Sequence, residues 1–266
     1  MTKEEDRNAV IKLTNLCTHY GDVLALDDIN LTVYEKEILV VMGHSGSGKS
    51  TLFKNVLGLM QHSSGTMEVL GKDLSKLNKK SLYDLRRNIG VAFQNGALFS
   101  SLTVRENVEL PLHEHTKLDN STIQIMTRMK LGLMNLADHE DLMPAQLSGG
   151  MLKRAGLARA VVMDPKLLFF DEPSAGLDPV TSAQLDTLIL QLRDALNMTI
   201  VIITHEMESA FHVADRITVL DKGKQIVTGT KDEIRLCEDE RIVNMLNRVS
   251  AIKEVDGDDY IRRLTE

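Results

Sequence analysis

Cysteine is scarce in this chain of 266 residues, which contains only Cys17 and Cys237. The two lie far apart, and neither has the C-x-x-C spacing or another metal-ligand spacing. We therefore expect two unpaired thiols in a reducing cytosol, and no disulfide framework or zinc centre. A chain of this length buries enough apolar surface to fold without either.

Long hydrophobic runs are also missing. The longest apolar stretches are residues 38–42, 167–170 and 200–203, far short of the roughly 18 residues that cross a bilayer. The N-terminus, MTKEEDRNAV, is charged and has no apolar segment of the kind found in secretory signals. We expect this protein to reach a membrane only through other chains.

Basic charge is not in excess. Lys and Arg total 31 against 38 for Asp and Glu, a net charge of −7. Proteins that bind nucleic acid usually carry a basic field, so this balance disfavours that class without excluding a local basic patch. The 43% apolar and 26% charged residues are ordinary for one or two globular domains and exclude a disordered or collagen-like chain.

The hydrophobic pattern changes twice along the chain. Up to about Val33, apolar and polar residues alternate, which predicts antiparallel strands with one solvated face. From about 95 to 164, strand signals give way to helical spacing. After that, strands and helices alternate, which predicts βαβ units and a mostly parallel sheet. Expected strands are 38–42, 66–70, 89–93, 167–170, 199–204, 217–220 and 225–227, and expected helices are 49–60, 121–136, 151–163, 179–196 and 206–214.

A phosphate-binding loop follows the continuous apolar run Ile38–Met42, which predicts a strand buried on both faces. The next residues fit G-x-x-x-x-G-K-[ST] and open a helical pattern, as such a loop requires. Its backbone N–H groups and the helix N-terminus would surround phosphates, Lys49 would reach the β- and γ-phosphates, and Ser50 would bind Mg²⁺. The predicted nucleotide-binding loop is Gly43, His44, Ser45, Gly46, Ser47, Gly48, Lys49, Ser50 and Thr51.

Two carboxylates end the apolar strand predicted at 167–170. Asp171 would hold Mg²⁺ at the carboxyl edge of the sheet, where open α/β sheets bind their ligands. Glu172 lies one residue further and points the other way, so it is a candidate base for a water that attacks the γ-phosphate.

Leu147, Ser148, Gly149 and Gly150 form a third motif in front of a predicted helix. Ser148 can cap that helix, but a cap does not account for two glycines. Two glycines before a helix can form a second set of N–H groups around a phosphate. Because one ATP needs only one phosphate loop, this second nest indicates a phosphate contacted from another subunit.

These motifs occur in the order seen in ATP-binding-cassette (ABC) ATPases, which the chain resembles from about residue 10 to 227. The resemblance rests on the phosphate loop, LSGG, LLFFDEP, SAGLDP and the Thr204-His205 pair. It implies an α/β ABC ATPase fold with a parallel-sheet core, an N-terminal antiparallel β subdomain and an inserted helical subdomain. The expected ATPase domain spans 1–230, with the helical insertion at about 95–164 and a charged helical tail at 231–266.

The resemblance also implies roles for matching residues. Gln94 corresponds to the glutamine near Mg²⁺ and the attacking water, and His205 to the histidine at the γ-phosphate. Asp178 corresponds to an aspartate that crosses the dimer, and Tyr20 to the aromatic that stacks on adenine. A head-to-tail homodimer is implied, with each ATP held between one subunit's phosphate loop and the other's LSGG helix.

One phosphate loop, one LSGG and no long coiled-coil insertion favour the ATPase subunit of a membrane transporter over translation factors or DNA-repair ATPases. The stretch 94–99, residues 111–116 and Met151 in place of the usual Gln resemble the ATPases of Mce-type lipid transporters, the Mla type. This implies a peripheral protein at the cytoplasmic face of the inner membrane. Alternatives are an amino-acid, metal or drug transporter, a nucleic-acid-linked ATPase, and a non-hydrolysing regulator, which an intact Glu172 and His205 disfavour.

The sequence offers candidate surfaces for partners and solvent in three regions. A cytoplasmic helix of the permease is expected to dock near Gln94–Val108, in a groove lined by Leu98, Phe99, Leu102 and Val104. On the LSGG helix, Lys153, Arg154 and Arg159 are expected on the solvated, phosphate-facing side. In the tail, Ile242, Met245, Leu246 and Val249 form an apolar helical stripe. That stripe packs either on its own core or on the partner subunit, where residues 253–266 would add anchors.

Overall fold

Residues 7–247 are described by a computed structural model, and their strands form one ten-stranded sheet in the order β5-β4-β1-β2-β10-β9-β3-β8-β7-β6. The strands are β1 (Ala9–Tyr20), β2 (Val23–Tyr34), β3 (Ile38–Met42), β4 (Ser64–Val69), β5 (Lys72–Asp73), β6 (Ile89–Ala92), β7 (Leu167–Asp171), β8 (Thr199–Thr204), β9 (Arg216–Asp221) and β10 (Lys224–Thr230). The helices are α1 (Lys49–Val56), α2 (Lys79–Arg86), α3 (Val104–His115), α4 (Asn120–Leu133), α5 (Gly149–Val161), α6 (Pro179–Leu196), α7 (Met207–Val213), α8 (Lys231–Arg235) and α9 (Glu240–Leu246).

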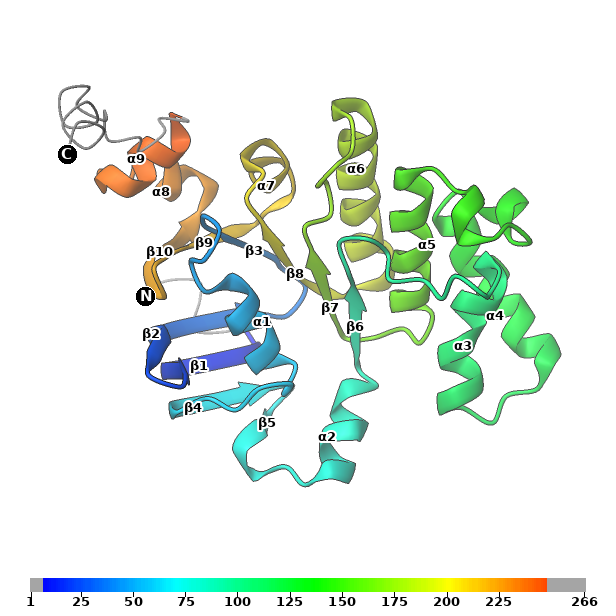
Figure 1. Ribbon diagram of the computed structural model, residues 1–266, viewed down its shortest axis with the longest axis horizontal. Helices are drawn as coiled ribbons and strands as arrows, with labels where there is room; N and C mark the ends of the chain where they lie inside the picture. Colours follow the sequence, from blue (N-terminus) through cyan, green and yellow to red (C-terminus); the bar gives the residue numbers. More distant parts are fainter. Residues whose placement is uncertain (1–6, 248–266) are drawn as a thin grey trace, which may run out of the picture.

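The sheet has a parallel part and an antiparallel part, as the sequence predicts. Strands β9, β3, β8, β7 and β6 run parallel, and β10 closes this part antiparallel to β9. The N-terminal strands pair antiparallel, and they join the parallel part through one pair, Lys224 with Asp27. Figure 1 shows the antiparallel strands at one side and α3, α4 and α5 gathered beyond β6 at the other.

Two hydrophobic cores lie on opposite faces of the parallel strands. In β3, all five residues are buried, and they alternate between the cores: Val40 points into one and Val41 into the other. The first core includes residues of α3, α4, α5 and α6. The second holds α1 between the parallel and antiparallel strands, where the Phe53 and Phe169 rings lie 5.1 Å apart. Burial on both faces explains why these strands are apolar throughout.

Helix boundaries differ from the prediction where local signals were weak. Helix α1 ends at Val56 and not near Met60, because Gly58 has a left-handed φ of +64° and Leu59 is exposed. The sequence pattern missed α2, which buries only Leu85. It also missed the bounds of α3, which carries Pro111 inside the helix, a residue that normally indicates a helix end.

The tail returns to its own chain as far as it is described. Ile242 in α9 is fully buried in the first core, and Met245 and Leu246 pack against that core. For these residues the structure shows the own-core alternative. Val249 and residues 253–266 lie outside the described residues. Across 7–247, no helix combines the length and apolar character that a bilayer crossing needs.

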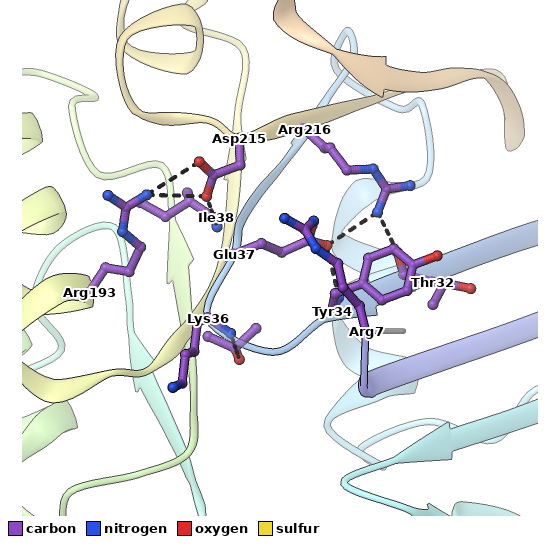
Figure 2. A network of polar contacts seen from close by, with 10 residues as sticks. Arg7, Thr32, Tyr34, Lys36, Glu37, Ile38, Arg193, Asp215 and Arg216 are labelled. Carbon is purple, nitrogen blue, oxygen red and sulfur yellow. Dashed lines mark hydrogen bonds and ion pairs between the residues drawn. The ribbon is translucent and has the colours of Figure 1, made fainter. Parts of the chain in front are cut away.

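A buried acid holds the starts of the central strands. Figure 2 shows Glu37, just before β3, between Arg216 and Tyr34. Its side chain accepts a hydrogen bond from the Tyr34 N–H at 2.8 Å and pairs with Arg216 at 3.3 Å. Burial raises the pKa of Glu37, while the Tyr34 N–H and Arg216 act in the opposite direction. Arg216 also donates to the Thr32 carbonyl at 3.1 Å, so this cluster joins β2 to β9.

A second carboxylate, that of Asp215, makes similar contacts near the Glu37 cluster. Asp215 accepts a hydrogen bond from the Ile38 N–H at 2.8 Å and pairs with Arg193 of α6 at 3.2 Å (Figure 2). The Lys36 N–H donates to the Thr199 hydroxyl at 2.9 Å, which joins the turn before β3 to β8. These contacts fix the register of β3, β8 and β9 at the N-terminal ends of the strands. The register at their C-terminal ends, where the sequence motifs begin, follows from it.

We predict opposite effects for two glycine-to-alanine changes. In β6, an added Cβ at Gly90 would lie 2.3 Å from the Ala160 carbonyl oxygen of α5. Gly90→Ala should therefore lower the free energy of unfolding by about 1–3 kcal/mol. At Gly132 in α4 nothing lies within 4 Å, so Gly132→Ala should raise it by up to about 1 kcal/mol through helix propensity. Denaturant unfolding measures both, and a Gly90→Ala protein as stable as wild type would contradict the close contact of β6 with α5.

Candidate active site

The phosphate loop leaves β3 and opens α1, as predicted. It turns through left-handed backbone at Gly46 (φ +79°) and Gly48 (φ +104°), where other residues are strained. Close approach adds a second reason for glycine: an added Cβ at Gly43 would lie 2.3 Å from the Leu220 carbonyl oxygen, and one at Gly48 would lie 2.8 Å from the side chain of Leu26. Any side chain at these positions would push the loop away from β9 or β2.

A turn distant in sequence braces the same loop. The Gly223 N–H, between β9 and β10, donates to the Ser47 carbonyl at 3.0 Å. The Gly223 carbonyl accepts from the Asp27 N–H of β2 at 2.8 Å. The loop is therefore held from outside by a glycine that sequence analysis did not identify, because no motif in the chain marks it.

Lys49 lies over the loop that it follows. Its side chain is largely buried, and the ammonium donates to the carbonyls of Gly43 at 2.6 Å and His44 at 2.9 Å. Burial lowers the pKa of Lys49, while Glu172 and Asp171 raise it. The ammonium is a buried positive charge that suits a negatively charged ligand, and the two carboxylates favour its charged form.

Asp171 ends β7 with a carboxylate whose charge is only partly compensated. Its pKa is raised by burial and by the nearby charge of Glu172, and Lys49 only partly offsets these effects. A divalent cation would stabilise the ionised carboxylate. Ser50 and Gln94 line the same cleft and add a hydroxyl and an amide oxygen, which makes an all-oxygen donor set of the kind that Mg²⁺ prefers.

Glu172 and His205 form a hydrogen-bonded pair. The Nδ1 atom of His205 lies 2.9 Å from Oε1 of Glu172, and the Thr204 hydroxyl donates to Oε2 at 3.1 Å. Glu172 has a left-handed φ of +48°, unusual for a residue other than glycine. This turn separates its side chain from that of Asp171, so one carboxylate is available for a metal and the other for a proton.

These residues surround a single cleft of 840 Å³. Tyr20, half exposed, lies at one side beside Val23 and Leu24, which together offer an apolar surface. Predicted residues in the lining are Tyr20, His44, Ser45, Gly46, Ser47, Gly48, Lys49, Ser50, Thr51, Gln94, Asp171, Glu172 and His205. Lining residues that the sequence did not identify are Val23, Leu24, Ala25, Ile203, Lys222 and Gly223.

The LSGG residues lie elsewhere. Within the described chain, the cleft lining includes none of Ser148, Gly149, Gly150 or Asp178. Ser148 is exposed and caps α5, accepting from the Met151 N–H at 3.3 Å. An added Cβ at Gly150 would lie 2.7 Å from the Thr181 side chain, whereas one at Gly149 would meet only ordinary contacts. Packing therefore explains Gly150 but not the exposed Gly149.

Asp178 has a local structural role. It caps α6, accepting from the N–H groups of Val180 at 3.1 Å and Thr181 at 3.0 Å. Bonds from Thr181 hold the pKa of this exposed carboxyl below its usual value. The cap fixes the start of α6 near the turn that follows Glu172.

Two expectations for basic residues on α5 are wrong. Lys153 is buried, and its ammonium donates to the carbonyls of Glu172, Pro173 and Ala175. Arg159 is partly buried, and its guanidinium donates to the Gly96 carbonyl at 3.0 Å. Burial lowers the pKa of this guanidinium. Both lie where α5 crosses other segments, and both bond to backbone carbonyls of those segments.

One residue expected to line the docking groove for the permease helix does not do so. Val104 is fully buried in the first core and cannot line a surface groove, although Phe99 is exposed. A groove of 470 Å³ lies between α2, α3, β6 and α5 instead. Its lining includes Tyr83, Arg87, Phe93, Pro111, His115 and Arg159.

Comparison with known proteins gives consistent matches. The family model described as ABC transporter matches residues 26–175. The chain is 36% identical over 260 residues to the intermembrane phospholipid transport system ATP-binding protein MlaF of Haemophilus influenzae, covering 97% of this chain and 98% of that protein. It is 39% identical over 233 residues to the probable ribonucleotide transport ATP-binding protein mkl of Mycobacterium tuberculosis, covering 88% of this chain and 65% of that protein.

A solved structure agrees with the fold. The dimeric structure of the ATP-binding cassette MJ0796, in a post-hydrolysis state bound to ADP and Pi, matches with a TM-score of 0.76 and 30% identity. The match covers 83% of this chain and 98% of that one. With the phosphate loop, LSGG and paired carboxylates placed as described, this chain belongs to the ABC transporter family and is an ATPase whose hydrolysis is coupled to transport.

Proposed function

We propose that this ATPase powers the movement of phospholipid between membranes of the bacterial envelope. The observation that carries the proposal is the match to MlaF, which runs through nearly the whole of both chains. The match to mkl is slightly higher in identity but leaves about a third of that protein uncovered. The protein would act at the cytoplasmic face of the inner membrane, held there by transmembrane subunits.

Each charged group that the sequence predicted for the cleft has a place in this reaction. Lys49 and the loop N–H groups bind the phosphates and stabilise charge that develops on the transferred phosphoryl group. Bound Mg²⁺, held by Ser50, Gln94 and Asp171, would neutralise phosphate charge. Glu172 accepts a proton from the attacking water. His205 orients Glu172 through Nδ1, which leaves its Nε2 for the γ-phosphate.

The complete site requires a second copy of the chain. Ser148, Gly149, Gly150 and Asp178 lie outside their own cleft, and the exposure of Gly149 has no packing explanation. In a head-to-tail homodimer, these residues would contact the ATP bound in the partner's phosphate loop. The dimeric state of the MJ0796 cassette supports this arrangement.

The groove between α2, α3, β6 and α5 is the proposed docking site for a cytoplasmic helix of the permease. Its aromatic side chains, Tyr83 and Phe93, are exposed, and Arg87 adds positive charge. Such a groove fits an amphipathic helix that carries acidic residues. The groove begins at the strand that leads to Gln94, so a docked helix would lie beside the nucleotide cleft.

A direct test isolates the chain with its native membrane partners. Complexes extracted with mild detergent should contain permease subunits and bound phospholipid, identified by mass spectrometry. In vesicles that hold the complex, ATP should move labelled phospholipid, and a complex with Lys49→Ala should not. Partner chains that bind ribonucleotide, amino acid or metal, together with no lipid movement, would replace the lipid proposal with another cargo.

Glu172→Gln should nearly abolish turnover while ATP still binds. Glutamine keeps the shape of the side chain but cannot accept the proton, a loss worth about 10²–10⁴-fold. The variant should accumulate as an ATP-bound dimer in sedimentation experiments. Glu206→Gln is the matched control, because Glu206 is an exposed acid 3.9 Å from the other side of His205. Phosphate release within about threefold of wild type for Glu172→Gln would rule out Glu172 as the base.

Ser148→Arg should abolish hydrolysis without weakening nucleotide binding to the monomer. The arginine would fill the space for the partner's γ-phosphate. Mixing this chain with a Lys49→Ala chain should restore activity, because one of the two mixed sites keeps both intact halves. Thr230→Arg changes another exposed helix cap in the same way and should stay active. No recovery on mixing, or normal hydrolysis by Ser148→Arg alone, would contradict the shared site.

A further inference from the structure

Lys153 has no role in the reaction described so far, yet all three N–H donors of its ammonium make hydrogen bonds. The residue lies on the second turn of α5 and is 6% exposed. The ammonium donates to the carbonyls of Pro173 at 2.6 Å, Ala175 at 2.7 Å and Glu172 at 3.1 Å. An ammonium has three donors, so all its hydrogen-bonding capacity goes to the backbone that follows β7.

The carbonyls that it binds belong to the turn that presents the proposed base. Glu172 is left-handed there, and Gly176 is left-handed as well (φ +75°). Left-handed backbone at a residue with a side chain costs about 1–2 kcal/mol. Three carbonyl oxygens that converge on one point repel each other unless a cation lies between them. Lys153 supplies that cation and stabilises a turn that is otherwise unfavourable.

Another buried lysine in the same helical region is paired differently. Lys130 of α4 is 7% exposed and bonds to the carboxylate of Asp164. Neither residue of that pair lines the nucleotide cleft. The contrast separates two roles: Lys130 neutralises an acid on the surface, whereas Lys153 shapes the backbone of a functional turn.

We propose that Lys153 is a positioning residue for Glu172 and joins the LSGG helix of each subunit to that subunit's own base. This inference rests on the proposed function, in which Glu172 is the base and Ser148 contacts the partner's ATP. Ser148 starts the helix that carries Lys153 one turn later. A phosphate that docks at the start of α5 in one site therefore acts on a helix bonded to the turn that places Glu172 in the other site.

Lys153→Met in the full-length chain should lower kcat by about 10- to 100-fold, the effect of misplacing a reacting group by about 1 Å. ATP affinity, measured with a fluorescent nucleotide, should stay within about twofold, because the lysine does not line the cleft. Lys130→Met is the matched control: it also removes a buried ammonium, but its kcat should stay within about twofold. Thermal unfolding of both variants shows that each is folded. Lys153→Arg, which keeps a cation, should recover part of the lost kcat.

A double-mutant cycle separates positioning from general damage. If Lys153 acts through Glu172, adding Lys153→Met to Glu172→Gln should change single-turnover hydrolysis by less than about twofold. A further loss as large as in the wild-type background would overturn the proposal. So would a Lys153→Met kcat equal to that of Lys130→Met, or a loss confined to ATP affinity. Normal turnover by Glu172→Gln would instead reject the base assignment, so the two failures are distinguishable.

Discussion

Three buried strands run side by side and parallel, with Met42 of β3 opposite Thr204 of β8 and Ile203 opposite Asp171 of β7. This register determines the site. The three strands end at the same edge of the sheet. The phosphate loop, His205 and the two carboxylates therefore lie at nearly the same level along the strand direction, within one or two residues of each other. A one-residue shift of β7 would exchange the faces of its side chains, turning Asp171 away from the cleft. At the opposite edge, the buried Glu37 and the exposed Asp215 hold this register through their hydrogen bonds to the backbone N–H groups of Tyr34 and Ile38.

The cleft side chains are held in place mainly by backbone contacts. Lys49 donates to two loop carbonyls, Gly223 bonds to Ser47, and Lys153 bonds to the turn after β7. The fold fixes the positions of backbone groups. A side chain that bonds to them is therefore held in a defined position relative to the sheet. The Glu172–His205 pair is the exception, since both partners are side chains. Glu172 also accepts hydrogen bonds from the Thr204 hydroxyl and the His205 N–H, so the pair is tied to the end of β8.

Motifs identified the cleft because their residues are close in sequence and their chemistry is distinctive. Lys49, Asp171 and Glu172 were found this way, as was the parallel core, from buried runs such as Ile38–Met42. Contacts between distant segments left no such signal. The brace from Gly223 and the carbonyl contacts of Lys153 join residues that no spacing relates. Charge alone placed Lys153 on a solvated face, and the apolar character of Val104 indicated a groove although it is in the core. Helix α3 was not predicted because Pro111, which lies inside it, normally indicates a helix end.

The position of α5 links these observations. Gly156 lets the helix approach Gly96 so closely that an added Cβ would lie 2.7 Å from its Cα atom. Arg159 bonds to the carbonyl of Gly96, two residues after Gln94. The same helix begins at Ser148 and reaches the base through Lys153. This helix therefore contacts the loop beside the proposed docking groove and the turn of the proposed base, and its N-terminus is the surface proposed to meet a partner's ATP. Because all three contacts are made by the 13 residues of α5 and its N-cap, a displacement of this helix would change all three.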